Sequence, residues 1–164
     1  MLVEIIRRTP SWVFVLFFVL LALGYFQSKD RTVSRGQVAI LPVAMIALSL
    51  HGVASAFGIA PVGLISWAVG AATAVRLGMM LIKTRGVSVS AETRSFFVPG
   101  SWLPLALMMA IFFTKYAVGV IVARQLPFAG ESVFVGLVSL CYGLLSGVFL
   151  ARALVIWRAV DVRL

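Results

Sequence analysis

Five polar side chains interrupt otherwise apolar stretches of the chain, and they are the residues best suited to chemistry: His51, Lys115, Tyr116, Cys141 and Tyr142. If each stretch is a helix, a rise of about 1.5 Å per residue puts Lys115 roughly 13 Å from the nearer end of its helix. The same count gives His51 this depth, and Cys141 and Tyr142 lie at that level of the last helix. The sequence therefore predicts one polar layer made of the five residues.

A lysine, a histidine and a tyrosine hydroxyl held together inside a membrane would bind an anion or an anionic lipid head group. His51 has Ala47 and Ser55 on its own helical row, and these small residues favour a position facing the other helices. The alternative is structural: Lys115 extends its ammonium group to the membrane surface, and His51 is hydrogen-bonded in the core. The sequence leaves both interpretations open.

The residue types that are missing disfavour several functions. All five acidic residues lie outside the apolar stretches, which argues against proton relays and cation-coupled transport. One histidine cannot provide both axial ligands of a haem, and one cysteine forms neither an intrachain disulfide nor a CxxC metal site. A nucleophile pair of Cys141 and His51 lacks a third group to orient the base. We therefore expect no enzyme, no cofactor and no metal site.

The composition indicates a membrane protein. Of 164 residues, 62% are hydrophobic and 12% charged, whereas soluble domains carry about 25% charged residues. The mean hydropathy is +1.12. The net charge of +9 is typical of basic residues that orient apolar helices and contact anionic lipid head groups. Nucleic acid is therefore not expected as a partner.

Uncharged runs near the roughly 20 residues needed to cross a bilayer predict five helices. The run from 36 to 75 has twice that length and contains Gly58-Ile59-Ala60-Pro61, which predicts a turn between two helices. No small-residue cleavage site follows the first stretch, so we expect an uncleaved helix rather than a signal peptide. The expected fold is all-α, a polytopic transmembrane helical bundle in a single domain over 1–164, with helices at about 11–27, 38–57, 61–82, 102–124 and 132–157.

Basic residues predict how the helices are oriented. On the side of the N-terminus lie Arg7, Arg8 and Arg124. On the opposite side lie Lys29, Arg31, Arg35, Lys83, Arg85, Arg94, Arg158 and Arg163. The positive-inside rule then puts the N-terminus outside and the C-terminus in the cytoplasm. Arg76 and Arg152 fall within about two turns of cytoplasmic helix ends, so we interpret both as side chains that extend to the interface.

The connection at 83–101 has a pattern of its own. Valines alternate with serines at 87–90, and the apolar segment 96–98 follows a short polar turn. Apolar residues at every second position on both sides of a turn predict a small β-hairpin at the cytoplasmic surface, with an unpaired solvated loop as the alternative. Ser101 is expected to cap the next helix, with Pro104 in its first turn.

Small residues recur every four positions on two of the expected helices, where they permit close helix contacts. Packing within one bundle is the favoured interpretation, and a seam between copies of the chain is the alternative. The residues are Ser139, Gly143, Gly147 and Ala151 on the last helix, and Gly70, Ala74 and Gly78 on the third.

Three segments carry a resemblance to a known family: TRSFFVPGSWLPL at 93–105, KYAVG at 115–119, and YGLLSG at 142–147 with the following Ala151-Arg152. They are similar to small bacterial inner-membrane proteins grouped as a domain of unknown function. A fainter similarity, in helix number and in a basic hairpin before the fourth helix, is to a membrane protein family named for cytochrome c biogenesis. The thiol pair that redox transfer needs is absent from this sequence. The resemblance implies a bacterial inner membrane and supplies no catalytic residue.

Two functions are compatible with these observations. The first is a non-enzymatic inner-membrane protein that serves as an accessory or assembly component through contacts with lipids, with a second copy or with a partner membrane protein. The second is a small transporter or channel subunit that binds an anion or anionic head group at the layer around Lys115 and His51.

Overall fold

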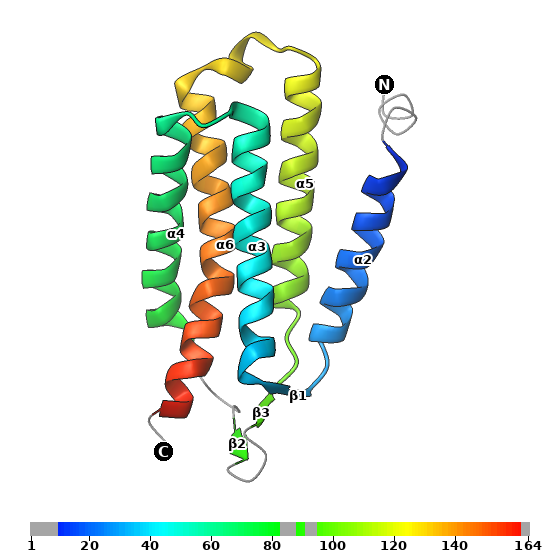
Figure 1. Cartoon of the computed structure of the whole chain (residues 1–164), viewed down its shortest axis with the longest axis vertical. Helices are drawn as coiled ribbons and strands as arrows, with labels where there is room; N and C mark the ends of the chain where they lie inside the picture. The colour runs from blue at the N-terminus through cyan, green and yellow to red at the C-terminus, as the bar shows by residue number, and fades with distance from the viewer. Residues whose placement is uncertain (1–9, 83–87, 91–94, 162–164) are drawn as a thin grey trace.

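The computed structural model describes residues 10–82, 88–90 and 95–161, and in these ranges the protein is a bundle of five α-helices with a small β-sheet at one end (Figure 1). The all-α fold class predicted from the sequence is confirmed. The elements in chain order are α2 (Ser11–Gln27), β1 (Arg31–Ser34), α3 (Arg35–Phe57), α4 (Pro61–Leu81), β2 (Ser88–Ser90), β3 (Ser95–Val98), α5 (Leu103–Ala123), the 3₁₀ helix η1 (Pro127–Gly130) and α6 (Ser132–Asp161).

Short local motifs set where α3 and α4 begin. The Ser34 hydroxyl accepts a hydrogen bond from the N–H of Gln37, and the Gln37 side chain accepts one from the N–H of Ser34 at 2.9 Å. This capping box starts α3 at Arg35, three residues before the predicted start. The predicted turn follows α3, where Gly58 adopts a positive φ of 68° and Pro61 opens α4.

The helices differ in length. Within the described ranges, α3, α4, α5 and α6 are long and apolar enough to cross a membrane. α2 has 17 residues, or about 25 Å, which is shorter than a hydrocarbon core of about 30 Å. At the start of α5, the N-cap is Trp102 and not Ser101 as predicted, and no side chain caps the helix there. The Ser101 hydroxyl lies one residue earlier and accepts a hydrogen bond from the N–H of Leu103 at 3.3 Å. α6 continues to Asp161, past its predicted end at 157.

The predicted hairpin forms, and a third strand extends it. β2 pairs antiparallel with β3, with Ser88 opposite Phe97 and Ser90 opposite Ser95. The turn at 91–94 lies outside the described residues. β1 pairs antiparallel with the other edge of β3, which gives the strand order β1-β3-β2. The sheet therefore ties the connection between α2 and α3 to the connection between α4 and α5.

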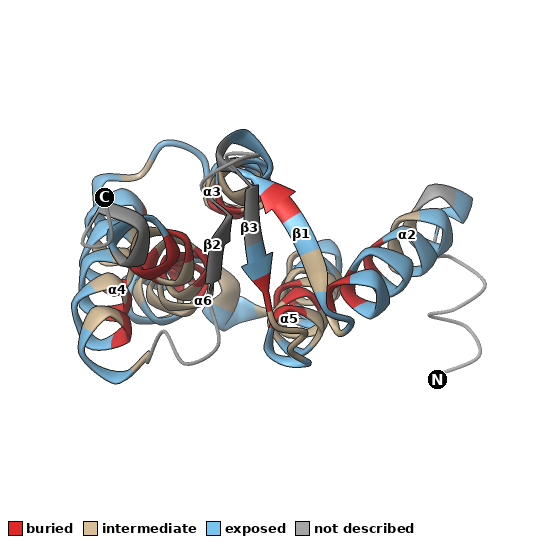
Figure 2. Ribbon diagram, turned by 90° about the horizontal axis from the view of Figure 1, so that it is seen from below, coloured by how far each residue is buried: buried red, intermediate tan, exposed pale blue. Residues whose placement is uncertain are grey.

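α6 lies at the centre of the bundle and contacts α3, α4 and α5. Seen along the helices, α4 and α2 lie at opposite ends of the arrangement (Figure 2). α2 leans away from α3 and packs mainly against α5 (Figure 1). The bundle is therefore compact around α6 and looser around α2.

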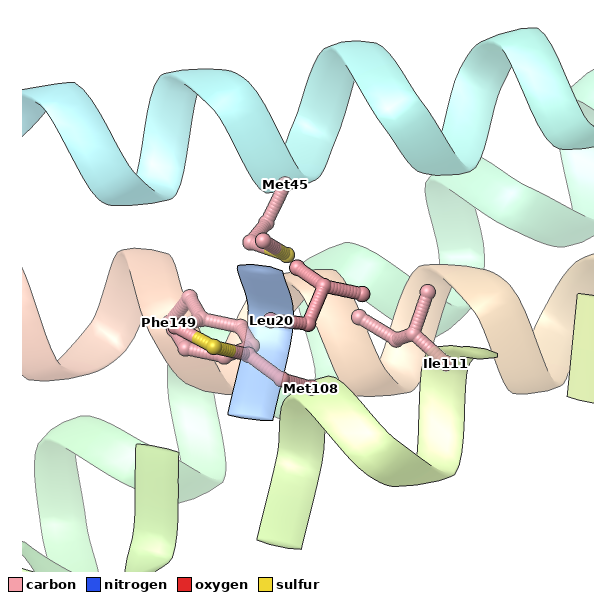
Figure 3. Close-up of a cluster of buried hydrophobic side chains, with 5 residues drawn as sticks. All are labelled: Leu20, Met45, Met108, Ile111 and Phe149. Atoms are coloured by element: carbon pink, nitrogen blue, oxygen red, sulfur yellow. The ribbon is translucent and has the colours of Figure 1, made fainter. Parts of the chain in front are cut away.

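One buried apolar cluster joins four helices near the middle of the bundle (Figure 3). A smaller cluster, made of Val33, Val98 and Ile156, packs the sheet against the end of α6. Both clusters bring α6 into contact with segments that are distant in sequence. The members of the larger cluster are Leu20 of α2, Met45 of α3, Met108 and Ile111 of α5, and Phe149 of α6.

Candidate functional site

The five predicted polar residues do not share one environment. His51 is exposed on α3, and Ala47 and Ser55 on the same row are exposed as well. The prediction that this row faces the other helices is therefore wrong. α3 packs instead through a different row, which includes Met45 and Ser49. Because α3 is apolar on every side, its sequence does not indicate which row is buried.

The other four predicted residues lie on α5 and α6. Tyr142 is only 1% exposed, and its ring lies about 3.5 Å from where a Cβ on Gly52 would be. Tyr142 therefore fills the contact between α6 and α3. The ring of Tyr116 stacks on a neighbouring phenylalanine of α5, with centroids 6.4 Å apart. The half-buried members are Lys115, Tyr116 and Cys141.

The small-residue rows pack against each other within one chain, where α4 and α6 run parallel. A Cβ on Gly143 would meet the carbonyl oxygen of Trp67 and lie 2.9 Å from the backbone nitrogen of Ala71. A Cβ on Gly147 would lie 2.6 Å from the carbonyl oxygen of Ala71, and Gly70 faces the backbone of α6 just as closely. We call this contact the α4–α6 seam. Its other predicted members, all buried, are Ser139, Ala151, Ala74 and Gly78.

Few polar groups lie next to the seam, and most of them are paired. The indole N–H of Trp67 donates to the hydroxyl of Ser49 at 3.0 Å and so joins α4 to α3. The Ser146 hydroxyl donates to the carbonyl oxygen of Tyr142 at 2.8 Å, one turn back along α6. Among the described side chains, the buried hydroxyl of Ser139 has no hydrogen-bond partner. The seam is therefore a packing surface with little polar chemistry.

A cavity of about 520 Å³ lies at the sheet end of the bundle, between α2, α3, α6 and the strands. Leu23 of α2 and Ile40 of α3 stand at its rim, and they are 46% and 66% exposed. The cavity therefore opens sideways between these two helices. Its deeper wall is apolar and includes Met45 and Phe149 of the large cluster. None of the five predicted polar residues lines it.

Two arginines line this cavity. The Nη2 of Arg31, in β1, donates to the Oε1 of Gln27 at 3.2 Å, and Gln27 is only 7% exposed. Burial lowers the pKa of Arg31 from its usual value. Arg152 of α6 lines the same cavity, close enough to Arg31 for the two positive charges to repel each other. Arg152 therefore lines a cavity, which the interpretation of it as a side chain that extends to the membrane interface did not include. Arg76 is exposed, and its extension to the interface stays a prediction.

The cavity escaped the sequence analysis because β1 helps to create it. Arg31 and Val33 are two residues apart on a strand, so their side chains share one face of the sheet. Val33 packs on Ile156 of α6, and this contact brings Arg31 toward α6 as well. The available signal was weak: a short β-branched stretch at 31–34, next to the capping sequence that opens α3.

A model of a family of unknown function, DUF6622, matches residues 1–163. The chain belongs to this family. DUF6622 membership confirms the resemblance to a domain-of-unknown-function family, and nothing in the match points to cytochrome c biogenesis. No curated protein and no solved structure matches the chain. The described residues of this chain include four apolar helices of membrane-spanning length.

Proposed function

We propose that this member of the DUF6622 family is a non-enzymatic protein of the bacterial inner membrane that acts as an accessory or assembly component through contacts within the bilayer. In this proposal all five helices cross the membrane, with the 17-residue α2 at the lower limit of spanning length. The N-terminus is then outside and the C-terminus in the cytoplasm. The excess of basic residues at the sheet end supports this orientation. Trp102 and Trp157, both exposed near that end, suit the head-group level of the same leaflet.

The observation that carries the proposal is the loose attachment of α2. This helix contacts α5 and contributes one buried residue, Leu20, to the central cluster, with the partly buried Leu16 packed against it. Along the rest of its length it exposes large apolar side chains, including Phe18 at 63% and Phe26 at 65%. A helix with so little contact inside its own chain has most of its surface available for a neighbouring helix or for lipid.

The transporter or channel alternative draws no support from the geometry. His51 is exposed on α3, whereas Lys115 is half-buried on α5. Tyr142 is used in packing against Gly52. An anion site that joins these residues therefore stays a prediction, and contact within the bilayer is the function that the arrangement of the helices favours.

Labelling of single cysteines tests the orientation. In a Cys141→Ser background, Pro10→Cys, Ser34→Cys and Gly130→Cys each place a thiol at an exposed position beside a helix end. A membrane-impermeant maleimide applied to spheroplasts should label positions 10 and 130, and position 34 only after permeabilisation. Labelling of 10 together with 34 would show that α2 does not span, and labelling of 34 alone would show the opposite orientation.

The same cysteine background tests the contact function. A photoreactive maleimide attached at Phe18→Cys on α2 should form a discrete protein cross-link in intact membranes. Leu77→Cys on the outer face of α4 is the matched control, because Leu77 is also exposed, at 50%. A product of twice the chain mass would identify a second copy as the neighbour. Cross-linking to lipid alone from both positions would contradict a protein contact through α2.

A further inference from the structure

The cavity at the sheet end is lined by two positive charges, and no negatively charged side chain is among the described residues that line it. Two carboxylates occur among the described side chains, Asp30 and Glu131. Asp30 accepts a hydrogen bond from the N–H of Gly100 at 2.7 Å, and Glu131 precedes α6 at the opposite end of the bundle. In the described part of the chain, neither Arg31 nor Arg152 forms an ion pair.

This arrangement is unfavourable unless an anion joins it. An arginine side chain stays protonated at any physiological pH. Two guanidinium groups that are both partly withdrawn from water lose hydration and repel each other, and a buried charge without a partner destabilises a fold. A ligand with a negatively charged oxygen group between Arg31 and Arg152 would remove both penalties, because guanidinium groups donate bidentate hydrogen bonds to phosphate.

The remaining walls indicate which kind of anion fits. The cavity volume of about 520 Å³ falls within the range of roughly 300–1,000 Å³ that small-molecule sites occupy. Its deeper wall is apolar, and its rim at Leu23 and Ile40 opens sideways, toward the acyl chains of a surrounding bilayer. A free inorganic anion would gain nothing from an apolar wall or a lateral opening, whereas a lipid uses both.

Two further groups suit the polar part of a lipid. Gln27 holds Arg31 through a hydrogen bond and also lines the cavity. Pro42 lies inside α3 and lacks an N–H, so the carbonyl oxygen of Val38 loses its usual helical donor and can accept a hydrogen bond from a ligand hydroxyl. Arg152 also lies at a suitable depth for a lipid phosphate, because it precedes the exposed Trp157 by about 7.5 Å along α6.

We infer that this cavity binds an anionic phospholipid, with its phosphate between Arg31 and Arg152 and an acyl chain leaving between α2 and α3. The lipid then fills the gap beside α2 and becomes part of the structure at this end of the bundle. This inference deepens the contact function proposed above and rests on it for the membrane setting. Its test uses the purified full chain, so a wrong orientation or a missing protein partner would not decide it.

The first test compares lipids of equal chain length. The delipidated protein in detergent is titrated with dioleoyl phosphatidylglycerol or dioleoyl phosphatidylcholine, and bound lipid is counted by native mass spectrometry. Phosphatidylglycerol should bind at least about tenfold more tightly, as expected for a paired charge in a partly dry site. Arg31→Gln with Arg152→Gln should abolish this preference. Arg76→Gln with Arg124→Gln, two exposed arginines outside the cavity, changes the net charge equally and should keep it.

The second test measures thermal unfolding with and without lipid. Without lipid, the double variant of Arg31 and Arg152 should unfold at the same temperature as the unmodified chain or higher, because it removes two unmatched charges. Phosphatidylglycerol should then raise the unfolding temperature of the unmodified chain only. The loss of the hydrogen bond from Arg31 to Gln27 should cost no more than about 1.5 kcal/mol. A double variant that loses clearly more stability than this without lipid would show that the arginines already have counter-charges in the protein, and it would overturn the inference.

Two other results would also overturn it. Equal binding of phosphatidylcholine and phosphatidylglycerol would show that the charges do not select the ligand. Inorganic phosphate that stabilises the protein as strongly as the phospholipid would identify a free anion as the ligand. Ala44→Phe distinguishes a phospholipid from a free anion, since it narrows the apolar part of the cavity and leaves both arginines in place. It should weaken phospholipid binding, and unchanged binding would contradict an acyl chain in the opening.

Discussion

The two sides of the bundle are built in opposite ways. At the α4–α6 seam, glycines bring two backbones so close that the added atom of an alanine would meet a carbonyl oxygen. On the side of α2, the helix leans outward and a cavity of about 520 Å³ remains beside it. Helices in lipid gain little from burying apolar surface, so close contact of small residues is what holds them together. The seam therefore stabilises the fold, and the looser side has room for a ligand or a neighbour.

The difference also appears in the polar groups. Beside the seam, most buried hydroxyl and indole groups find partners within the chain, such as Trp67 with Ser49. At the cavity, two arginines line the same space, and no described carboxylate lines it with them. Buried polar groups that are paired within the chain stabilise the fold. Partly buried charges without a counter-charge indicate that a ligand or another molecule supplies it.

The largest expected effect comes from filling the seam. Gly143→Leu adds a side chain where even a Cβ would meet the carbonyl oxygen of Trp67, so α4 and α6 must separate. We expect a loss of about 3 kcal/mol or more in the free energy of unfolding, measured by denaturant titration in detergent. Gly119→Leu is the control, because a Cβ on Gly119 has nothing within 4 Å. If both variants were equally stable, the seam would not be the stabilising contact.

A smaller and more local effect is expected on the side of α2. A Cβ on Gly24 would lie 2.9 Å from the Cα of Leu105, where α2 crosses α5. Gly24→Leu should displace α2 at a cost of about 1–3 kcal/mol. Hydrogen–deuterium exchange should rise in 11–27 while 61–81 remains protected. Faster exchange in both segments would show that α2 is an integral part of the core, and would remove the contrast between the two sides.

The features that were predictable from the sequence are those with local signals. The turn at Gly58 and the hairpin of β2 and β3 follow from short motifs, and both are present. The start of α5 was predicted to within one residue, with Trp102 in place of Ser101 as the N-cap. The seam follows from small residues at a spacing of four, a pattern that local sequence shows directly. Each of these predictions needed only a few neighbouring residues.

The features that were missed depend on which segments meet. Whether His51 faces lipid or protein depends on the rotation of α3, and a helix that is apolar all round has no amphipathic signal to indicate it. The cavity depends on β1 pairing with β3, which joins Arg31 to Val98 across more than sixty residues. Arg152 then lines the same cavity as Arg31, although neither residue is unusual in its own segment.

The smallest expected effects come from removing the two buried hydroxyl groups of α6, and they test whether the seam is a packing surface without a polar function. Ser139 and Ser146 are both fully buried on α6, but only the Ser146 hydroxyl has an acceptor, the carbonyl oxygen of Tyr142. Ser139→Ala should therefore leave the free energy of unfolding unchanged or raise it by up to about 1 kcal/mol, because it removes an unpaired buried hydroxyl. Ser146→Ala should lower it by about 0.5–1 kcal/mol. Thermal unfolding of both variants in the same detergent compares them directly. A larger loss of unfolding free energy for Ser139→Ala than for Ser146→Ala would mean that the Ser139 hydroxyl binds a group from outside the chain. The seam, like the cavity, would then contain a polar group whose partner is another molecule.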